Sequence, residues 1–179
     1  SFTPDTNTLL GEVPEVKNLF LSCGLNSIGI GSGGGVGKVT AEWLMTGHIN
    51  EDIFNYDIKR FQKFHSKLGF IKHRITESLG DLYGMHWPYK QHKTSRNIKT
   101  LPYHELLKGF GACFGVSAGY ERPMWFALDG EKAKYEYSYN YQNWYPSVEY
   151  ETYNTLKNVG LFDLTPFSKF EIKSDKAHD

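Results

Sequence analysis

Residues 24–37 read Gly-Leu-Asn-Ser-Ile-Gly-Ile-Gly-Ser-Gly-Gly-Gly-Val-Gly, and half of them are glycine. The apolar run 18–23 that precedes this stretch predicts a short buried strand. In residues 38–45, which follow it, apolar side chains recur at helical spacing, and Gly47 is suited to end such a helix. The sequence therefore predicts a strand, a glycine loop and a helix in this order.

The glycine loop admits two interpretations. Residues 29–34 match the pattern GxGxxG, in which glycines let the backbone approach a ligand and the following helix presents free N–H groups. A dinucleotide-binding unit also requires an acidic residue about 20 positions further on, at the end of a second strand. Glu51 and Asp52 stand at about that distance, but no convincing strand precedes them. The pattern alone thus fits a loop that contacts a cofactor and a loop that is only closely packed.

The rest of the chain predicts a mixture of helices and strands. A helix is expected over 57–68, with Asp57 as its N-cap and Gly69 at its end. Residues 70–100 are polar and broken by glycine and proline, so we expect no long element there. Further along we expect a short helix (103–108), strand or loop (111–128), a strand of alternating tyrosines (135–141), a helix (147–159) and a second alternating strand (167–172).

The composition excludes several classes of protein. Lys plus Arg and Asp plus Glu both number 20, so the formal net charge is zero. A sequence-independent nucleic-acid binder or a polybasic membrane-surface module requires an excess of cations. The tyrosine segment 135–141 is therefore a half-buried strand in our interpretation, and not a stacking platform for nucleic acid. No apolar run approaches ~18 residues, so no membrane span is expected.

The chain also lacks the common patterns of metal and nucleophile chemistry. Cys23 and Cys113 are far apart and stand in apolar or glycine-rich surroundings, so both are expected to be buried, reduced thiols. The histidines show no ligand spacing, and we expect no metal site. We find no Ser/His/Asp or Cys/His arrangement that indicates a catalytic triad.

Three stretches, in this order, resemble one known architecture. The first resembles the C-terminal end of the FAD domain of the D-amino-acid-oxidase-like superfamily, within it the dimethylglycine and sarcosine dehydrogenase group; it comprises Ser1–Asp5, Leu10–Pro14, Gly24–Ile30, Gly33–Gly37 and Glu42-Trp43. The second resembles the small central domain of those enzymes. The third is similar to the start of a folate-binding aminomethyltransferase domain and comprises Gly115–Phe126, Asn143–Tyr145, Val159–Asp163 and Phe170–Ile172.

The resemblance implies an α/β (α+β) fold in three parts. These are the end of an FAD-binding domain (1–56), a central domain (57–108) and the start of an aminomethyltransferase-like domain (109–179). The chain begins at Ser1 without an initiator Met, and we expect it to be an internal piece of a longer protein. By resemblance, the glycine loop is a late loop that returns to the flavin and not the dinucleotide fingerprint.

The implied reaction is FAD-dependent oxidative demethylation of an N-methyl amino acid of the dimethylglycine or sarcosine type. The one-carbon unit would pass to tetrahydrofolate, and the location would be the bacterial cytoplasm or the mitochondrial matrix. The expected partners are the small N-methyl amine and the remainder of the parent chain; the electron acceptor is left undefined and the catalytic residues are expected outside the chain. The residues expected to bind the cofactor are Asn26, Ser27, Ile28, Gly29, Ile30, Gly33, Gly34 and Gly35. The alternative is a non-enzymatic regulatory relative, similar to the regulatory subunit of pyruvate dehydrogenase phosphatase.

Overall fold

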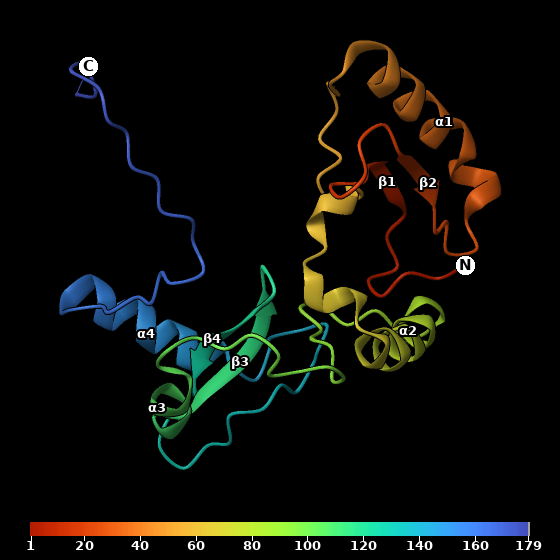
Figure 1. Cartoon of the computed structure of the whole chain (residues 1–179). Coiled ribbons are helices and arrows are strands. Elements are labelled where there is room, and N and C mark those ends of the chain that lie inside the picture. The colour runs from red at the N-terminus through yellow and green to blue at the C-terminus, as the bar shows by residue number, and fades with distance from the viewer. Residues whose placement is uncertain (179) are drawn as a thin grey trace. The chain divides into compact units, whose positions relative to one another are not determined.

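The computed structural model describes residues 1–178, which form two compact units. The first consists of Ser1–His86 and His92–Ser95, and the second of Trp87–Gln91 and the residues from Arg96 onwards. Figure 1 shows the elements of each unit, a mixed set of short strands and helices that agrees with the predicted α/β (α+β) class. Each unit is described by itself below.

The first unit begins with an antiparallel hairpin and a long helix (Figure 1). Strand β1 (Leu9–Glu12) pairs with β2 (Phe20–Cys23), and helix α1 (Gly29–Thr46) follows. Trp43 of α1 packs its ring edge-to-face on Phe20 at 5.7 Å. The same indole fills the space beside Gly11, where an added Cβ would lie 2.5 Å from the ring. Close approach of the helix to the hairpin therefore requires glycine at this position.

Helix α1 corrects the expected glycine loop. The helix begins at Gly29, so residues 29–37 form its first turns and not a loop that precedes it. Glycine is a poor helix former, but its backbone can adopt helical angles. The helix can therefore begin at Gly29, directly after the tight turn. Gly47 ends α1 as predicted, with φ +76° and its N–H donated to the carbonyl of Trp43 at 2.9 Å. Strand β2 was expected to be buried, but its residues are half-buried or exposed.

The predicted helix 57–68 is wrong. The structure has two single 3-10 turns, Ile58–Arg60 and Lys63–Ser66, separated by extended backbone. Asp57 is nevertheless the N-cap of the first turn, since its carboxylate accepts the N–H of Lys59 at 2.8 Å. Arg60, in the same turn, forms a two-pronged ion pair with Asp5, 55 positions earlier, at 2.6 and 3.0 Å.

Helix α2 (Leu68–Tyr83) occupies a region where no long element was expected. It runs through Gly69 and Gly80, whose positions are open enough to carry a side chain, and it ends at Gly84. Its buried face consists of Phe70, Arg74 and Ser78, spaced four residues apart. Two of these three residues are polar, so the hydrophobic pattern did not reveal the helix.

The second unit is built on another hairpin. Strand β3 (Ala112–Ser117) pairs antiparallel with β4 (Tyr120–Phe126), which confirms strand structure within 111–128, and a bulge lies between Cys113 and Phe114. The short helix α3 (His104–Gly109) precedes the hairpin and α4 (Tyr145–Lys157) follows it, close to the predicted ranges. The apolar core consists of Leu101, Ala112, Cys113 and Trp125.

Neither of the predicted alternating strands forms. In the described part of the chain, residues 135–141 and 167–172 lie outside all strands. Tyr135 and Tyr137 instead pack their rings against Trp144, with centroids 5.1 and 6.3 Å away. Alternation provides a strand with two faces, but a strand also requires a neighbour that accepts its backbone hydrogen bonds.

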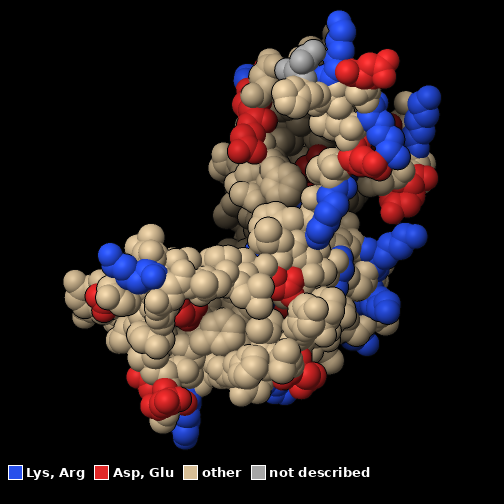
Figure 2. All heavy atoms as spheres, turned by 90° about the vertical axis from the view of Figure 1, so that its left-hand side faces the viewer, with Lys and Arg blue, Asp and Glu red and all other residues tan. Residues whose placement is uncertain are grey.

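The distribution of charged side chains on the surface agrees with the zero net charge. On the face shown in Figure 2, acidic and basic side chains lie interspersed, and much of the face carries neither. Among the helices of the described residues, none combines the length and the apolar character that a membrane span requires.

Candidate functional site

The turn that joins β2 to α1 is held by a buried asparagine. Asn26 is only 1% exposed, and its Oδ1 accepts the backbone N–H of Thr3 at 2.8 Å and the hydroxyl of Thr3 at 3.3 Å. Its Nδ2 donates to the carbonyl of Gly24 at 2.7 Å. Both Asn26 and Ser27 have positive φ, at 46° and 70°, a conformation that asparagine tolerates better than most residues. These bonds fix the direction in which α1 leaves the turn.

The first turns of α1 present a surface almost free of side chains. Beyond the adjacent residues and the nearby backbone of the helix itself, ideal Cβ atoms added at Gly31, 33, 34, 35 and 37 would meet no described atom within 4 Å. The N-cap Ile28 provides no side-chain hydrogen bond, so no side chain of the cap satisfies the first N–H groups of the helix. This end of α1 therefore combines exposed backbone with the positive end of the helix dipole.

The predicted cofactor residues form one continuous segment but differ in environment. Asn26 is buried and committed to Thr3 and Gly24, whereas Ile28 and Ile30 are 58% and 104% exposed. The remaining predicted residues, Ser27, Gly29 and Gly33 to Gly35, are half-buried or exposed on the same turn and helix. Flavin contact by this segment stays a prediction.

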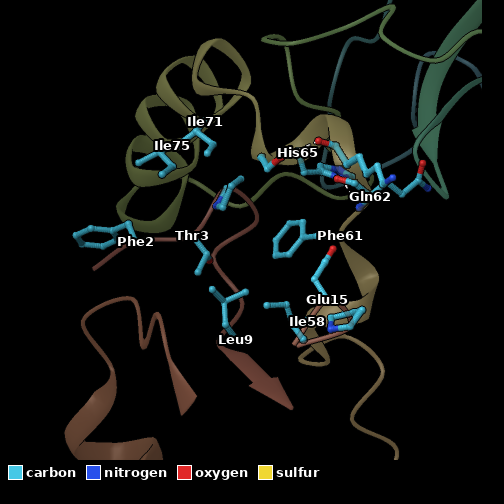
Figure 3. A pocket seen from close by; sticks show the side chains of 14 residues that line it. Phe2, Thr3, Leu9, Glu15, Ile58, Phe61, Gln62, His65, Ile71 and Ile75 are labelled. Carbon is cyan, nitrogen blue, oxygen red and sulfur yellow. Dashed lines mark hydrogen bonds between the residues drawn. The ribbon is translucent and has the colours of Figure 1, made fainter. Parts of the chain in front are cut away.

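A cavity that the sequence did not reveal lies elsewhere in the first unit. Its volume is about 450 Å³, and Figure 3 shows Phe61 pointing into it from one side and Ile71 and Ile75 of α2 from another. Leu9 closes part of its floor. Its walls come from segments up to about 70 positions apart, so no local sequence pattern could predict the cavity. The cavity suits a small apolar group.

His65 lines the cavity, and its imidazole is a side chain that can change charge near neutral pH (Figure 3). Its Nδ1 accepts the N–H of Gln62 at 2.9 Å. The ring stacks on Phe64 at 3.9 Å and meets Phe70 edge-on at 5.0 Å. Burial lowers the pKa of His65 below its ordinary value, so the imidazole is neutral near pH 7.

Comparison with known proteins finds a family match within the chain and relatives that cover nearly all of it. Residues 46–100 match the family described as FAD dependent oxidoreductase central domain. The whole chain is 42% identical to a 4-methylaminobutanoate oxidase (formaldehyde-forming) of Paenarthrobacter nicotinovorans, over 99% of the chain and 22% of that protein. It is also 35% identical to the mitochondrial sarcosine dehydrogenase of Mus musculus, over 93% of the chain and 18% of that protein.

The homologues of this chain are of the sarcosine and dimethylglycine dehydrogenase type. The resemblance found in the sequence is thereby confirmed. A relative whose name indicates a different function, the mitochondrial pyruvate dehydrogenase phosphatase regulatory subunit of Mus musculus, is 34% identical over 97% of the chain. The chain spans about a fifth of the length of the curated relatives it matches. The division at residues 56 and 108 stays a prediction, although the matched residues 46–100 overlap the expected central domain.

Proposed function

We propose that this chain is part of an FAD-dependent enzyme that oxidatively demethylates an N-methyl amino acid of the dimethylglycine or sarcosine type. The observation that carries the proposal is the 42% identity, over nearly the whole chain, to an oxidase whose name includes an N-methylated amino acid and formaldehyde. The names of the dehydrogenase relatives describe substrates of the same class. A location in the bacterial cytoplasm or the mitochondrial matrix is consistent with the bacterial and mitochondrial sources of these relatives.

The flavin-facing surface in this proposal is the turn before α1 together with the first turns of that helix. FAD, when bound, supplies the acceptor for the hydride of the amine. The chain supplies backbone N–H groups and the positive end of a helix dipole, which favour negative charge beside them. We assign the contacts to Ser27, Ile28, Gly29, Ile30, Gly33, Gly34 and Gly35, and to Asn26, which is buried, the role of positioning the turn.

The loss of helix stability caused by the glycines supports a ligand at this surface. The first turns of α1 contain six glycines, and each costs a helix about 1 kcal/mol relative to alanine. Packing within the described residues does not require five of them, because an added Cβ would meet no atom there. A flat group that approaches the backbone closely gives these positions a reason to lack side chains.

We further propose that the one-carbon unit passes to tetrahydrofolate. This part rests on the resemblance of the second unit to the start of an aminomethyltransferase domain. The small N-methyl amine, tetrahydrofolate and the remainder of the parent chain are then the partners of the complete protein.

The test compares flavin content in variants of the complete protein. Gly33→Val and Gly34→Val place β-branched side chains on the proposed surface and should lower the flavin bound per protein, read from its visible absorbance. Gly80→Val in α2 is the matched control, since an added Cβ there also meets no atom within 4 Å. Unchanged flavin content in the α1 variants would contradict the proposed contact, and a complete protein that never carries flavin would contradict the function itself.

The relative named as a phosphatase regulatory subunit favours a second candidate, a non-enzymatic regulatory protein. The two candidates differ in amine-dependent reduction of an artificial electron acceptor. Reduction by dimethylglycine, sarcosine or 4-methylaminobutanoate supports the enzyme. Flavin binding without reduction by any of the three supports the regulatory protein.

A further inference from the structure

Two carboxylates and an imidazole meet on the outer side of α2. Glu77 and Asp81 stand one helical turn apart, and His92 comes from the returning segment 92–95 of the same unit. The Nδ1 atom of His92 lies 3.9 Å from Oε1 of Glu77 and 3.8 Å from Oδ2 of Asp81. One ligand atom from each residue falls within 4.8 Å of the other two.

Neighbouring groups hold the Glu77 carboxylate in place. The backbone N–H of Lys93 donates to Oε1 at 2.6 Å, and that of Thr94 donates to Oε2 at 2.9 Å. The hydroxyl of Thr94 is a third donor, to Oε2. Burial alone would raise the pKa of Glu77, but these hydrogen bonds lower it below its ordinary value, so the group is a carboxylate at neutral pH. A carboxylate has about four lone-pair sites, and Oε1 accepts only one of the three hydrogen bonds, which leaves a site on Oε1 for a cation. Such outer hydrogen bonds are what orient a metal ligand.

We propose that Glu77, Asp81 and His92 bind a divalent transition-metal ion, with zinc as the best-fitting example. Imidazole nitrogen and carboxylate oxygen are both zinc ligands at about 2.0–2.2 Å, which places ligand atoms roughly 3.4 Å apart in a tetrahedral site. The distances from His92 to the two carboxylates are 3.8 and 3.9 Å and the third separation lies within 4.8 Å, so binding requires an inward movement of the side chains. The nitrogen ligand argues against magnesium and calcium, which prefer oxygen alone.

The charges around the cluster are consistent with a cation. Two carboxylates one helical turn apart repel each other, and a dication between them removes that repulsion. Arg74 is the guanidinium that faces the cluster from α2, and its Nε lies 4.0 Å from Oε2 of Glu77. It lies at Oε2, whereas His92 lies near Oε1, so Arg74 does not occupy the oxygen atom that faces the imidazole. The three ligand side chains are 12%, 30% and 35% exposed, so an ion can enter from solvent.

The bound ion would join the returning segment to α2. His92 and the backbone N–H groups of the next two residues reach the same turn of the helix. Metal binding would therefore raise the stability of the first unit, because only the folded state brings the three ligands together.

The test titrates zinc into the complete protein after chelation and dialysis. Calorimetry should detect one zinc ion whose affinity falls at least about tenfold in His92→Ala and in Asp81→Asn. His73→Ala removes an exposed histidine from the same helix and should leave that affinity unchanged. Glu77 is avoided as a first variant because it also holds the backbone of Lys93 and Thr94.

A second measurement separates loss of ligands from loss of fold. Circular dichroism of the apo variants should match the apo wild type, and zinc should raise the melting temperature of the wild type and of His73→Ala only. Three results would overturn the site: no zinc binding by the wild type, equal affinity in the His92 and Asp81 variants, or an equal loss in the His73 control. None of these readouts depends on flavin or amine oxidation, so the site can fail while the proposed function stands.

Discussion

Cys23 and Cys113 stand in opposite environments, although both were expected to be buried. Cys23 is exposed on β2, whereas Cys113 is 4% exposed on β3. Burial raises the pKa of the Cys113 thiol to about 11, with the nearby charge of Arg96 offsetting only part of the effect. Because the thiolate is the reactive form, the two cysteines should differ strongly in the rate at which they react with thiol reagents.

We therefore predict one fast and one protected thiol. Cys23 should react with Ellman's reagent at pH 8 in the folded protein, and Cys113 should react only after unfolding in denaturant. Cys23→Ser should abolish the fast phase, while Cys113→Ser should preserve it. Two fast thiols in the folded protein would contradict the burial of Cys113.

Glu121 and Arg96 form the most buried ion pair of the second unit. Glu121 is 2% exposed, and its two oxygens accept from Arg96 at 2.7 and 2.5 Å and from the N–H of Asn97 at 2.8 Å. We predict that Arg96→Ala destabilises the protein by roughly 3 kcal/mol, because it leaves a buried carboxylate without its counter-ion. Urea unfolding followed by tryptophan fluorescence measures this, and a loss below 1 kcal/mol would count against the pair.

The same pair predicts a dependence on acid. Burial alone would raise the pKa of Glu121, but the hydrogen bonds from Arg96 and Asn97 lower it below 4.5, its ordinary value. The unfolded state then binds the proton more readily, so this contribution to stability is complete above pH 4.5 and is lost as the pH falls through the folded-state pKa. The difference in unfolding free energy between wild type and Arg96→Ala should shrink from pH 7 to pH 3. A constant difference would contradict the assignment.

At the scale of elements, α1 is a helix that its own glycines weaken. Gly35 is exposed and open, so Gly35→Ala should stabilise the helix by about 1 kcal/mol where no flavin is bound. The gain should appear as increased helicity in far-ultraviolet circular dichroism and a higher melting temperature. In the complete protein the same change should lower flavin occupancy if the backbone of α1 faces the cofactor. Loss of helicity in the flavin-free variant would show that a contact exists at Gly35.

At the scale of the whole molecule, the exposed apolar surface of the second unit is extensive. Tyr150, Tyr153 and Leu156 of α4 are 56–77% exposed, and Leu161 beyond it is fully exposed. Extensive exposed apolar surface marks sites of contact with other protein or of aggregation. We predict that residues 1–179 expressed alone bind the dye ANS and melt without a sharp cooperative transition. Leu156→Gln and Leu161→Gln should reduce dye binding, and a sharp melt without dye binding would contradict the prediction.

Local chemistry made several elements predictable. Asp57 caps a turn, Gly47 ends α1, and α4 begins near Pro146, because each of these effects depends on neighbouring residues alone. The ordered family motifs of the chain were likewise visible in the sequence, and the resemblance they indicate agrees with its homologues. The helical state of residues 29–37 was not predictable, because glycine carries no side-chain pattern.

The sequence by itself thus determined the family resemblance, the class of fold and the ends of several helices. Only the tertiary structure decided which polar residues are buried and which distant segments meet. The hydroxyl of Ser78 donates to the carbonyl of Pro4, 74 positions away, and Asn26 holds Thr3 across 23 positions. His92 likewise reaches Glu77 and Asp81 only after the chain returns to α2. Hydrogen bonds and ion pairs between distant positions leave no periodic trace in a sequence, so their partners appear only once the chain is folded.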